Sequence, residues 1–171
     1  MEELIAPLRI LIVAPRPGAV RPVPSRATIE AVYAAFEAQG ERVEVECLWP
    51  PRVETLQARL SDSGRAHIDI VYLDTTVTLS DVGPAFVLES IPPDAWSLGG
   101  NALAELLLAA GVRLLILHPH GQRNAVEALD LWAAARGDAR LGFLVLDERL
   151  EPHSLQNLLT GLLAVWLAGD A

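Results

Sequence analysis

The sequence predicts an α/β domain in which a mainly parallel β-sheet lies between two layers of helices. Short apolar runs rich in β-branched residues alternate with longer segments whose apolar residues recur at helical spacing. This alternation is typical of βαβ units, which form doubly wound, three-layer sandwiches. A length of 171 residues and an apolar content of 51% suffice for one domain with a sizeable core. We therefore expect a single domain over residues 1–171, and the sequence leaves open whether further domains follow in a longer protein.

Two predicted strands and one helix begin the chain. Residues 9–14 (RILIVA) are apolar on both faces, which predicts a buried central strand. A proline-rich loop follows, and residues 25–39 then carry apolar side chains at helical spacing, with Ser25 as the cap. Residues 42–49 (RVEVECLW) alternate between apolar and charged side chains, which indicates an edge strand with one solvated face. Cys47 lies on the apolar face of that strand, so we expect it to be buried.

A third strand and an irregular connection come next. The Pro50-Pro51 pair ends the edge strand, and a short helix leads to residues 68–73 (IDIVYL), which form another buried strand. Residues 74–99 are rich in Pro, Gly, Ser and Asp. That composition favours an irregular segment with one short β-like piece at residues 85–88.

The second half of the chain repeats the alternation of helix and strand. Helical spacing predicts helices over residues 101–111, 124–135 and 152–167. Short apolar runs predict strands over residues 112–117 and 141–146. Because the half-polar second strand suits an edge, we expect about five strands in the order 2-1-3-4-5, with the first strand central.

The composition narrows the classes of partner and compartment. A formal net charge of −9 provides no basic face for nucleic acid and disfavours an anionic membrane surface. The N-terminal residues lack the features of a signal peptide, and the apolar runs are too short or too interrupted to span a bilayer. A single cysteine excludes an intrachain disulfide and a cysteine-rich zinc site. We therefore expect a cytoplasmic protein with no nucleic-acid or membrane partner.

The loops of the predicted fold lack the motifs of common α/β enzymes. No G-x-G-x-x-G or Walker loop is present, and residues 15–24 (PRPGAVRPVP) contain prolines that remove the N–H donors a phosphate requires. The carboxylates and lysine of a receiver domain and the G-x-S-x-G nucleophile elbow are also missing from the sequence. We therefore expect no cofactor.

The order and spacing of five segments resemble a known family. The segments RILIVAPRPG, VEVECLWPPRVETLQARL, IDIVYLD, GPAFVLES and GGNALAELLLAAGVRLLILH together resemble the CHAT family, the caspase-like peptidase domains of bacteria. The resemblance covers roughly residues 8–168. It implies a caspase-like fold and a role in a bacterial signalling or defence system.

The two catalytic positions of that family are replaced in this chain. The family's strand ending H-F-x-G-H-G corresponds to residues 72–77 (YLDTTV), which puts Thr76 in place of the general-base histidine. The strand ending L-N-A-C-x-S corresponds to residues 117–122 (LHPHGQ), which puts His120 in place of the nucleophilic cysteine. Hydrolysis by this dyad needs a thiolate beside a histidine. The resemblance therefore implies a catalytically inactive domain that acts as a protein-binding, regulatory or scaffold module.

Two histidines and one aspartate are candidate binding residues at the predicted strand ends. Asp74, His118 and His120 form a donor set that metal ions accept. However, Pro119 between the histidines predicts an extended backbone that points their side chains apart. We therefore expect no metal, and a solvated loop in which one histidine makes a hydrogen bond.

Two other interpretations of the same strand ends stay open. Thr75 or Thr76 could serve as a hydroxyl nucleophile with His120 as the base, and with Asp74 and His118 nearby this would make a non-standard hydrolase. A pocket above the first, third and fourth strands would instead make a small-molecule-binding domain.

Two further residues are candidates for binding. Glu89 occupies the place of the acidic residue in the family's g-x-L-x-x-E segment. Trp96 is a candidate pocket-lining residue, because tryptophan combines a large apolar surface with one polar group.

The last helix and the last strand favour association with another protein. The helix carries a leucine-rich stripe broader than the roughly 100° that one sheet face uses, and residues 141–146 form an apolar strand with one side free to pair. We expect a protein partner or a homodimer at this end of the sheet. The candidate interface residues are Phe143, Leu159, Leu163 and Trp166.

Overall fold

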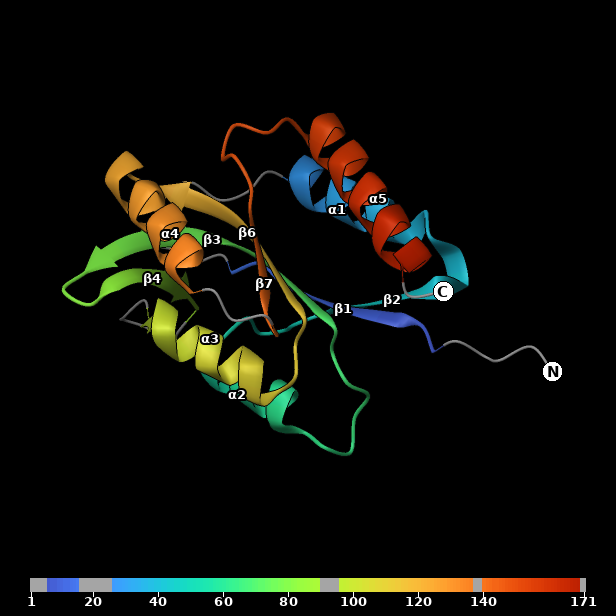
Figure 1. Ribbon diagram of the computed structural model, residues 1–171, viewed down its shortest axis with the longest axis horizontal. Helices are drawn as coiled ribbons and strands as arrows, with labels where there is room; N and C mark the ends of the chain where they lie inside the picture. Colours follow the sequence, from blue (N-terminus) through green and yellow to red (C-terminus); the bar gives the residue numbers. More distant parts are fainter. Residues whose placement is uncertain (1–5, 16–25, 90–95, 137–139, 170–171) are drawn as a thin grey trace.

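The computed structural model describes residues 6–15, 26–89, 96–136 and 140–169. Within these ranges it contains a seven-stranded, mostly parallel β-sheet flanked by five α-helices, which is the α/β class that the sequence predicts (Figure 1). Ser25 and most of the proline-rich loop before it lie outside the described residues.

Five of the described strands pair in parallel, in the order β2-β1-β3-β6-β7. They are β1 (Leu8–Val13), β2 (Val43–Cys47), β3 (Ile70–Ser80), β6 (Leu114–Gly121) and β7 (Gly142–Val145). This is the predicted order 2-1-3-4-5, with β1 inside the sheet and the half-polar β2 at an edge. The acidic side chains of β2 are paired at this edge, in the ion pairs Arg9–Glu44 at 2.7 Å and Arg59–Glu46 at 2.8 Å.

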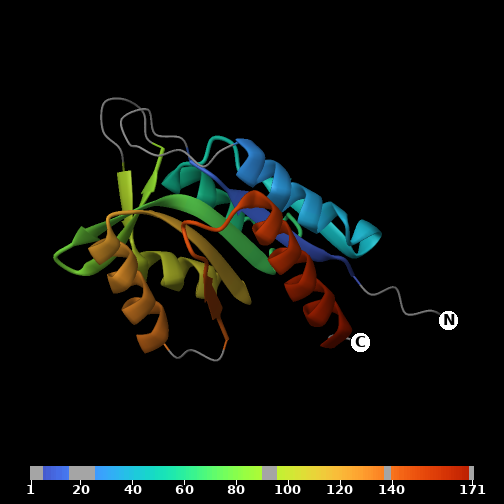
Figure 2. The same cartoon turned by 90° about the horizontal axis from the view of Figure 1, so that it is seen from above.

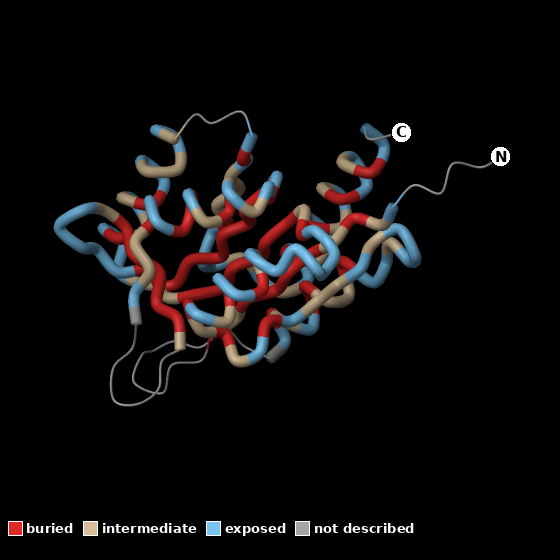
Figure 3. The backbone as a smooth tube through the Cα atoms, turned by 90° about the horizontal axis from the view of Figure 1, so that it is seen from below, coloured by how far each residue is buried: buried red, intermediate tan, exposed pale blue. Residues whose placement is uncertain are grey.

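Two helical layers cover the two faces of the sheet. The helices α1 (Arg26–Glu37) and α5 (Pro152–Gly169) cover one face, and α2 (Val53–Ser61), α3 (Gly100–Ala109) and α4 (Arg123–Ala135) cover the other (Figure 2). Figure 3 shows that the buried residues concentrate along the strands between these layers. None of the helices in the described ranges has the length and apolar character that crossing a membrane requires.

The strand β3 divides its side chains between two hydrophobic clusters. Ile70 and Tyr72 belong to the cluster under α1 and α5, whereas Val71 and Leu73 belong to the opposite cluster. The strand β6 alternates in the same way over residues 114–117. Because side chains alternate along a strand, the even-numbered residues of β3 and β6 face α1 and α5.

Residues 74–99 do not form the irregular segment that the sequence predicts. The strand β3 continues to Ser80 and turns back into β4 (Gly83–Leu88), which pairs antiparallel with β3 and with β5 (Trp96–Gly99). The β-branched run TTVT favours an extended strand, and the Asp and Gly residues mark the tight turn that follows it. The strand β4 takes the edge of β3 beyond the end of β1, since Val77 pairs with β4 on one side and with β6 on the other.

Cys47 is exposed, which corrects the expectation that it is buried. It is the last residue of β2, at the edge of the sheet, where its sulfur accepts a hydrogen bond from the Tyr33 hydroxyl at 2.6 Å. Val43 and Val45 on the same strand are partly buried against the cluster under α1. The cluster therefore covers Val43 and Val45 but leaves Cys47 exposed.

Two of the predicted interface residues, Leu159 and Leu163, are fully buried inside the domain. The helix α5 packs against α1 as well as against the sheet, so it uses a wider apolar stripe than one sheet face requires. Leu158 and Val165 remain on the surface of this helix, 44% and 74% exposed.

The other two predicted interface residues are partly buried. The Trp166 ring lies 5.4 Å from the Arg113 guanidinium carbon, measured to the ring centroid. The Phe143 ring packs edge-on against Trp132, with centroids 5.2 Å apart. Among the described residues β7 has β6 as its strand partner and no partner on its other edge.

The substitutions Leu159→Ala and Val165→Ala distinguish the buried and exposed sides of α5. Leu159→Ala should lower the free energy of unfolding by about 2–5 kcal/mol, because it leaves a cavity between α5, α1 and the sheet. Val165→Ala should change it by less than about 0.5 kcal/mol, because the side chain is mostly in solvent. Urea denaturation followed by circular dichroism measures both values, and equal losses would contradict this packing.

Candidate functional site

The strand β6 continues beyond its predicted end through the segment HPHG. These residues pair with β3, so that Asp74 lies opposite His118 and Thr76 lies opposite His120. Beyond Leu117 the other edge of β6 has no strand partner among the described residues, a setting that tolerates a proline in a strand. The predicted solvated loop is therefore part of a buried strand.

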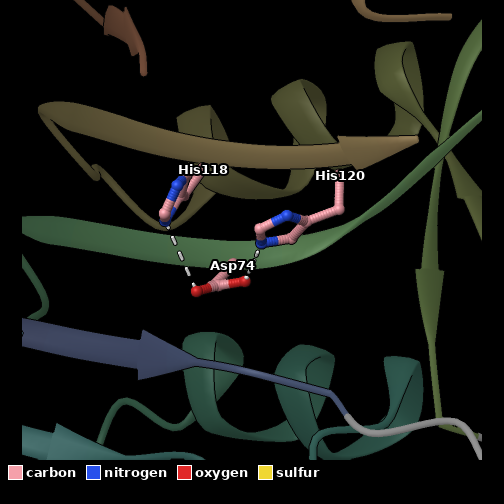
Figure 4. A group of neighbouring side chains, drawn as sticks. All are labelled: Asp74, His118 and His120. Atoms are coloured by element: carbon pink, nitrogen blue, oxygen red, sulfur yellow. Dashed lines mark hydrogen bonds and ion pairs between the residues drawn. The ribbon is translucent and has the colours of Figure 1, made fainter. Parts of the chain in front are cut away.

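The extended backbone brings the two histidines together. Alternate residues of a strand point to the same face, so His118 and His120 share a face with each other and with Asp74. Figure 4 shows both imidazoles of β6 directed toward the carboxylate of β3. The expectation that Pro119 separates the histidines is therefore wrong, because pairing with β3 holds the segment extended and places both on one side.

Short contacts join these three residues, which we call the Asp74 cluster. His120 Nε2 lies 2.8 Å from Asp74 Oδ1, and His118 Nδ1 lies 3.5 Å from Asp74 Oδ2. The Tyr72 hydroxyl is hydrogen-bonded to His118 Nδ1 at 3.0 Å. Asp74 is fully buried, His118 is 2% exposed and His120 is 9% exposed. The cluster is nearly closed to solvent, and His120 forms its most accessible side.

The environment of the cluster sets two protonation states. Burial by itself would raise the pKa of Asp74, but the contacts with His118 and His120 and their positive charge outweigh it and lower that pKa. Burial, and then the charge of Asp74, raise the pKa of Tyr72 well above its usual value. Asp74 is therefore ionised at neutral pH, and the Tyr72 hydroxyl keeps its proton.

Two buried atoms of the cluster have no hydrogen-bond partner within the described residues, namely Asp74 Oδ2 and His118 Nε2. The Tyr72 hydroxyl is hydrogen-bonded to the other ring nitrogen of His118, Nδ1, so this bond does not satisfy Nε2. Buried polar groups are nearly always satisfied in folded proteins, so each exception requires an explanation. The unmet hydrogen-bonding capacity makes the cluster a candidate binding site.

The remaining predicted site residues do not join the cluster. The Thr75 hydroxyl donates to a backbone carbonyl of β4, and Thr76 is half-buried without a hydrogen bond to either histidine in the described part of the chain. Glu89 follows β4, and its N–H donates to the Pro51 carbonyl at 3.0 Å. Trp96 begins β5, and its side chain lies outside the described residues.

Tyr72 is the residue of this site that sequence reasoning missed. It lies two positions before Asp74 on β3 and therefore on the same face. A buried tyrosine normally needs a hydrogen-bond partner for its hydroxyl. A tyrosine inside the apolar run IDIVYL was thus a signal that a polar partner lies on the neighbouring strand.

A hollow of about 650 Å³ lies beyond the cluster, between the end of β3 and the start of α4. It is lined by residues 76–79 and by residues of the β6–α4 junction, and Thr76 is the predicted site residue among them. A Cβ atom at Gly121 would lie 2.5 Å from the Val77 carbonyl oxygen, so this close approach of β6 to β3 requires glycine.

The donor atoms of the cluster lie close enough together for a metal ion. One ligand atom from each of Asp74, His118 and His120 lies within 4.8 Å of the others. Two imidazoles and a carboxylate are ligands that zinc accepts.

A scan against protein-family models and a search of curated proteins found no match to this chain. The chemistry of the site therefore rests on its geometry.

The substitution Asp74→Asn tests the charge of the cluster. We expect the free energy of unfolding to fall by about 3 kcal/mol in metal-free buffer near neutral pH, as for other broken buried ion pairs. Because the folded-state pKa of Asp74 is lowered, this loss should be complete above a pH of about 4 and shrink as the pH falls through that pKa. Chemical denaturation at several pH values measures it.

The matched control is Asp81→Asn, because Asp81 is exposed in the turn between β3 and β4. It should change the free energy of unfolding by less than about 0.5 kcal/mol. A difference between wild type and Asp74→Asn that grows on acidification would contradict an ionised, stabilising carboxylate.

Proposed function

We propose that this domain binds another protein and has no catalytic activity of its own, as a degenerate caspase-like domain of the CHAT type. The order of segments along the chain supports this proposal, and the mostly parallel α/β sheet is compatible with it. A regulatory or scaffold role in a bacterial signalling or defence system follows from the resemblance. A cytoplasmic location fits a chain with a single cysteine, which forms no internal disulfide.

The observation that carries the proposal is the pairing of Thr76 with His120. In the resemblance, Thr76 corresponds to the histidine base and His120 to the cysteine nucleophile. Thr76 and His120 are register partners on adjacent parallel strands. Neither residue provides a thiolate, and the single cysteine of the chain is at the end of β2, beyond β1. Dyad chemistry needs both groups, so their replacement at two paired positions favours a binding role.

The alternative of a non-standard hydrolase has part of the required machinery. Asp74 and His120 form an acid–imidazole pair at 2.8 Å, as in a hydrolytic triad. However, the Thr76 hydroxyl has no hydrogen bond to His120 within the described residues. A hydroxyl without a base in contact is a weak nucleophile, so the geometry favours binding over hydrolysis.

Apolar side chains on α5 offer a surface for the partner. Leu158 and Val165 are exposed and Leu162 between them is partly buried, at the spacing that aligns residues along one side of a helix. The described outer edge of β7 is unpaired, and such an edge presents backbone groups that can pair with another chain. A second copy of this chain or another protein would cover this end of the sheet.

An assay of peptide and ester hydrolysis tests the absence of catalysis. We expect the purified domain to show no turnover of a peptide library or a chromogenic ester above the buffer background, because no activated nucleophile among the described residues faces His120. The matched control is Thr78→Val, an exposed threonine on the same strand. Turnover that is lost in Thr76→Val and in His120→Ala but kept in Thr78→Val would contradict the proposal.

Light scattering across a concentration series tests the proposed surface on α5. The average mass of the wild type should rise with concentration, and the double variant Leu158→Glu/Val165→Glu should stay monomeric, because it puts two charges into an apolar contact. Leu131→Glu on α4 is the control, since Leu131 is 73% exposed on another helix, and it should behave like the wild type. A wild type that is monomeric at every concentration would exclude a homodimer through α5.

A further inference from the structure

Three potential ligand atoms converge between the middle of β3 and the second half of β6. In a tetrahedral zinc site with bonds of about 2.0–2.1 Å, the ligand atoms lie about 3.3 Å apart. The 3.5 Å between His118 Nδ1 and Asp74 Oδ2 agrees with that separation. His120 Nε2 lies 2.8 Å from the other carboxylate oxygen, Asp74 Oδ1, and one donor atom from each of the three residues lies within 4.8 Å of the others, so the imidazoles must adjust to bind one ion together with the carboxylate. With that adjustment the spacing of the donors is suitable for one ion.

The carboxylate of Asp74 is only half satisfied. Its Oδ1 contacts His120 Nε2, whereas its Oδ2 has no hydrogen-bond partner within the described residues. Because the side chain is fully buried, bulk solvent does not complete its hydrogen bonding. A cation bound to Oδ2 would supply the missing partner and offset the buried negative charge.

The donors are held in place without an ion. Asp74 and His118 are register partners of β3 and β6, and His120 follows on the same face. The Tyr72 hydroxyl orients the His118 ring through Nδ1, and this hydroxyl would give up the nitrogen when an ion binds. Ligands on paired strands are positioned more accurately than ligands on loops, so binding would require little reordering of the chain.

We propose that Asp74, His118 and His120 bind a divalent transition-metal ion, with zinc the best match to two nitrogen donors and one oxygen donor. Magnesium and calcium prefer ligation by oxygen alone and fit this set poorly. Binding releases the proton that His120 Nε2 donates to Asp74, and a water molecule takes the fourth position on the accessible side of His120. The ion links β3 to β6, whether or not the domain also binds a protein.

Titration of the chelator-treated protein with zinc chloride tests this proposal. Isothermal calorimetry should give one ion per chain, and zinc should raise the temperature of thermal unfolding, because the ion binds only the folded arrangement. Cobalt(II) in place of zinc should give the visible absorption of a tetrahedral site with nitrogen and oxygen donors.

Variants identify the ligands. Asp74→Asn and His120→Gln should each weaken zinc binding by more than about a hundredfold, beyond the 10–100-fold typical of losing an outer-shell partner. The chain has four histidines, and the two outside the cluster, His67 and His153, are exposed. The double variant His67→Gln/His153→Gln is therefore the matched control, and it should bind zinc as the wild type does.

Two results would overturn the proposal. The first is metal-free wild type that binds no equivalent of zinc at micromolar concentration and gives no tetrahedral cobalt spectrum. The second is binding that is lost in His67→Gln/His153→Gln and kept in Asp74→Asn, which would assign the ion to surface histidines. The wild-type cobalt spectrum and the surface control keep the test decisive even where a cluster variant fails to fold.

Discussion

Residues 70–77 of β3 pair in parallel with residues 114–121 of β6, and this pairing holds the candidate site together. It keeps HPHG extended, sets Asp74 opposite His118 and brings Thr76 beside His120. Both hydrophobic clusters also draw side chains from these two strands, so the pairing connects the two helical layers. Because side chains alternate, a shift of one residue would turn Asp74 to the other face and leave both histidines without their acid.

The Asp74 cluster is costly for a protein interior. Burying a carboxylate is unfavourable unless hydrogen bonds and opposite charge compensate it, and here one of its oxygens stays without a hydrogen-bond partner among the described residues. Apolar side chains would fill the same volume beside Ile70 and Tyr72 without that cost. Departures from optimal packing of this kind are expected at functional sites. A bound metal ion would account for both the buried acid and its free oxygen.

The proposed metal site and the proposed partner surface lie on different parts of the domain. The first depends on the middle of β3 and the second half of β6, and the second depends on the exposed side of α5 and the edge of β7. Under the proposed function His120 serves no nucleophile, so its imidazole can stay bonded to Asp74 and is available as a ligand. The two proposals are therefore compatible and can be tested separately.

The sequence by itself determined the fold class and the order of the parallel strands. The apolar run at residues 9–14 indicates a strand buried on both faces, and the alternation at residues 42–49 indicates a strand buried on one face. Each pattern can be recognised from the side chains of its own segment. The polar identities of Asp74, His118 and His120 at predicted strand ends were also visible, so the candidate residues could be named before their geometry was known.

Only the tertiary structure decided that HPHG is a strand and that the three polar side chains meet, whereas the β-branched residues of TTVT by themselves favour an extended strand. HPHG has no apolar alternation that indicates a strand, and Pro119 opposes one, so hydrogen bonds from the neighbouring strand must supply the stabilisation. The burial of Leu159 and Leu163 likewise depends on α1 lying beside α5. The periodic pattern of a segment reports which side is buried but not which distant segment covers it, and for this reason the geometry of the site emerged only from the folded structure.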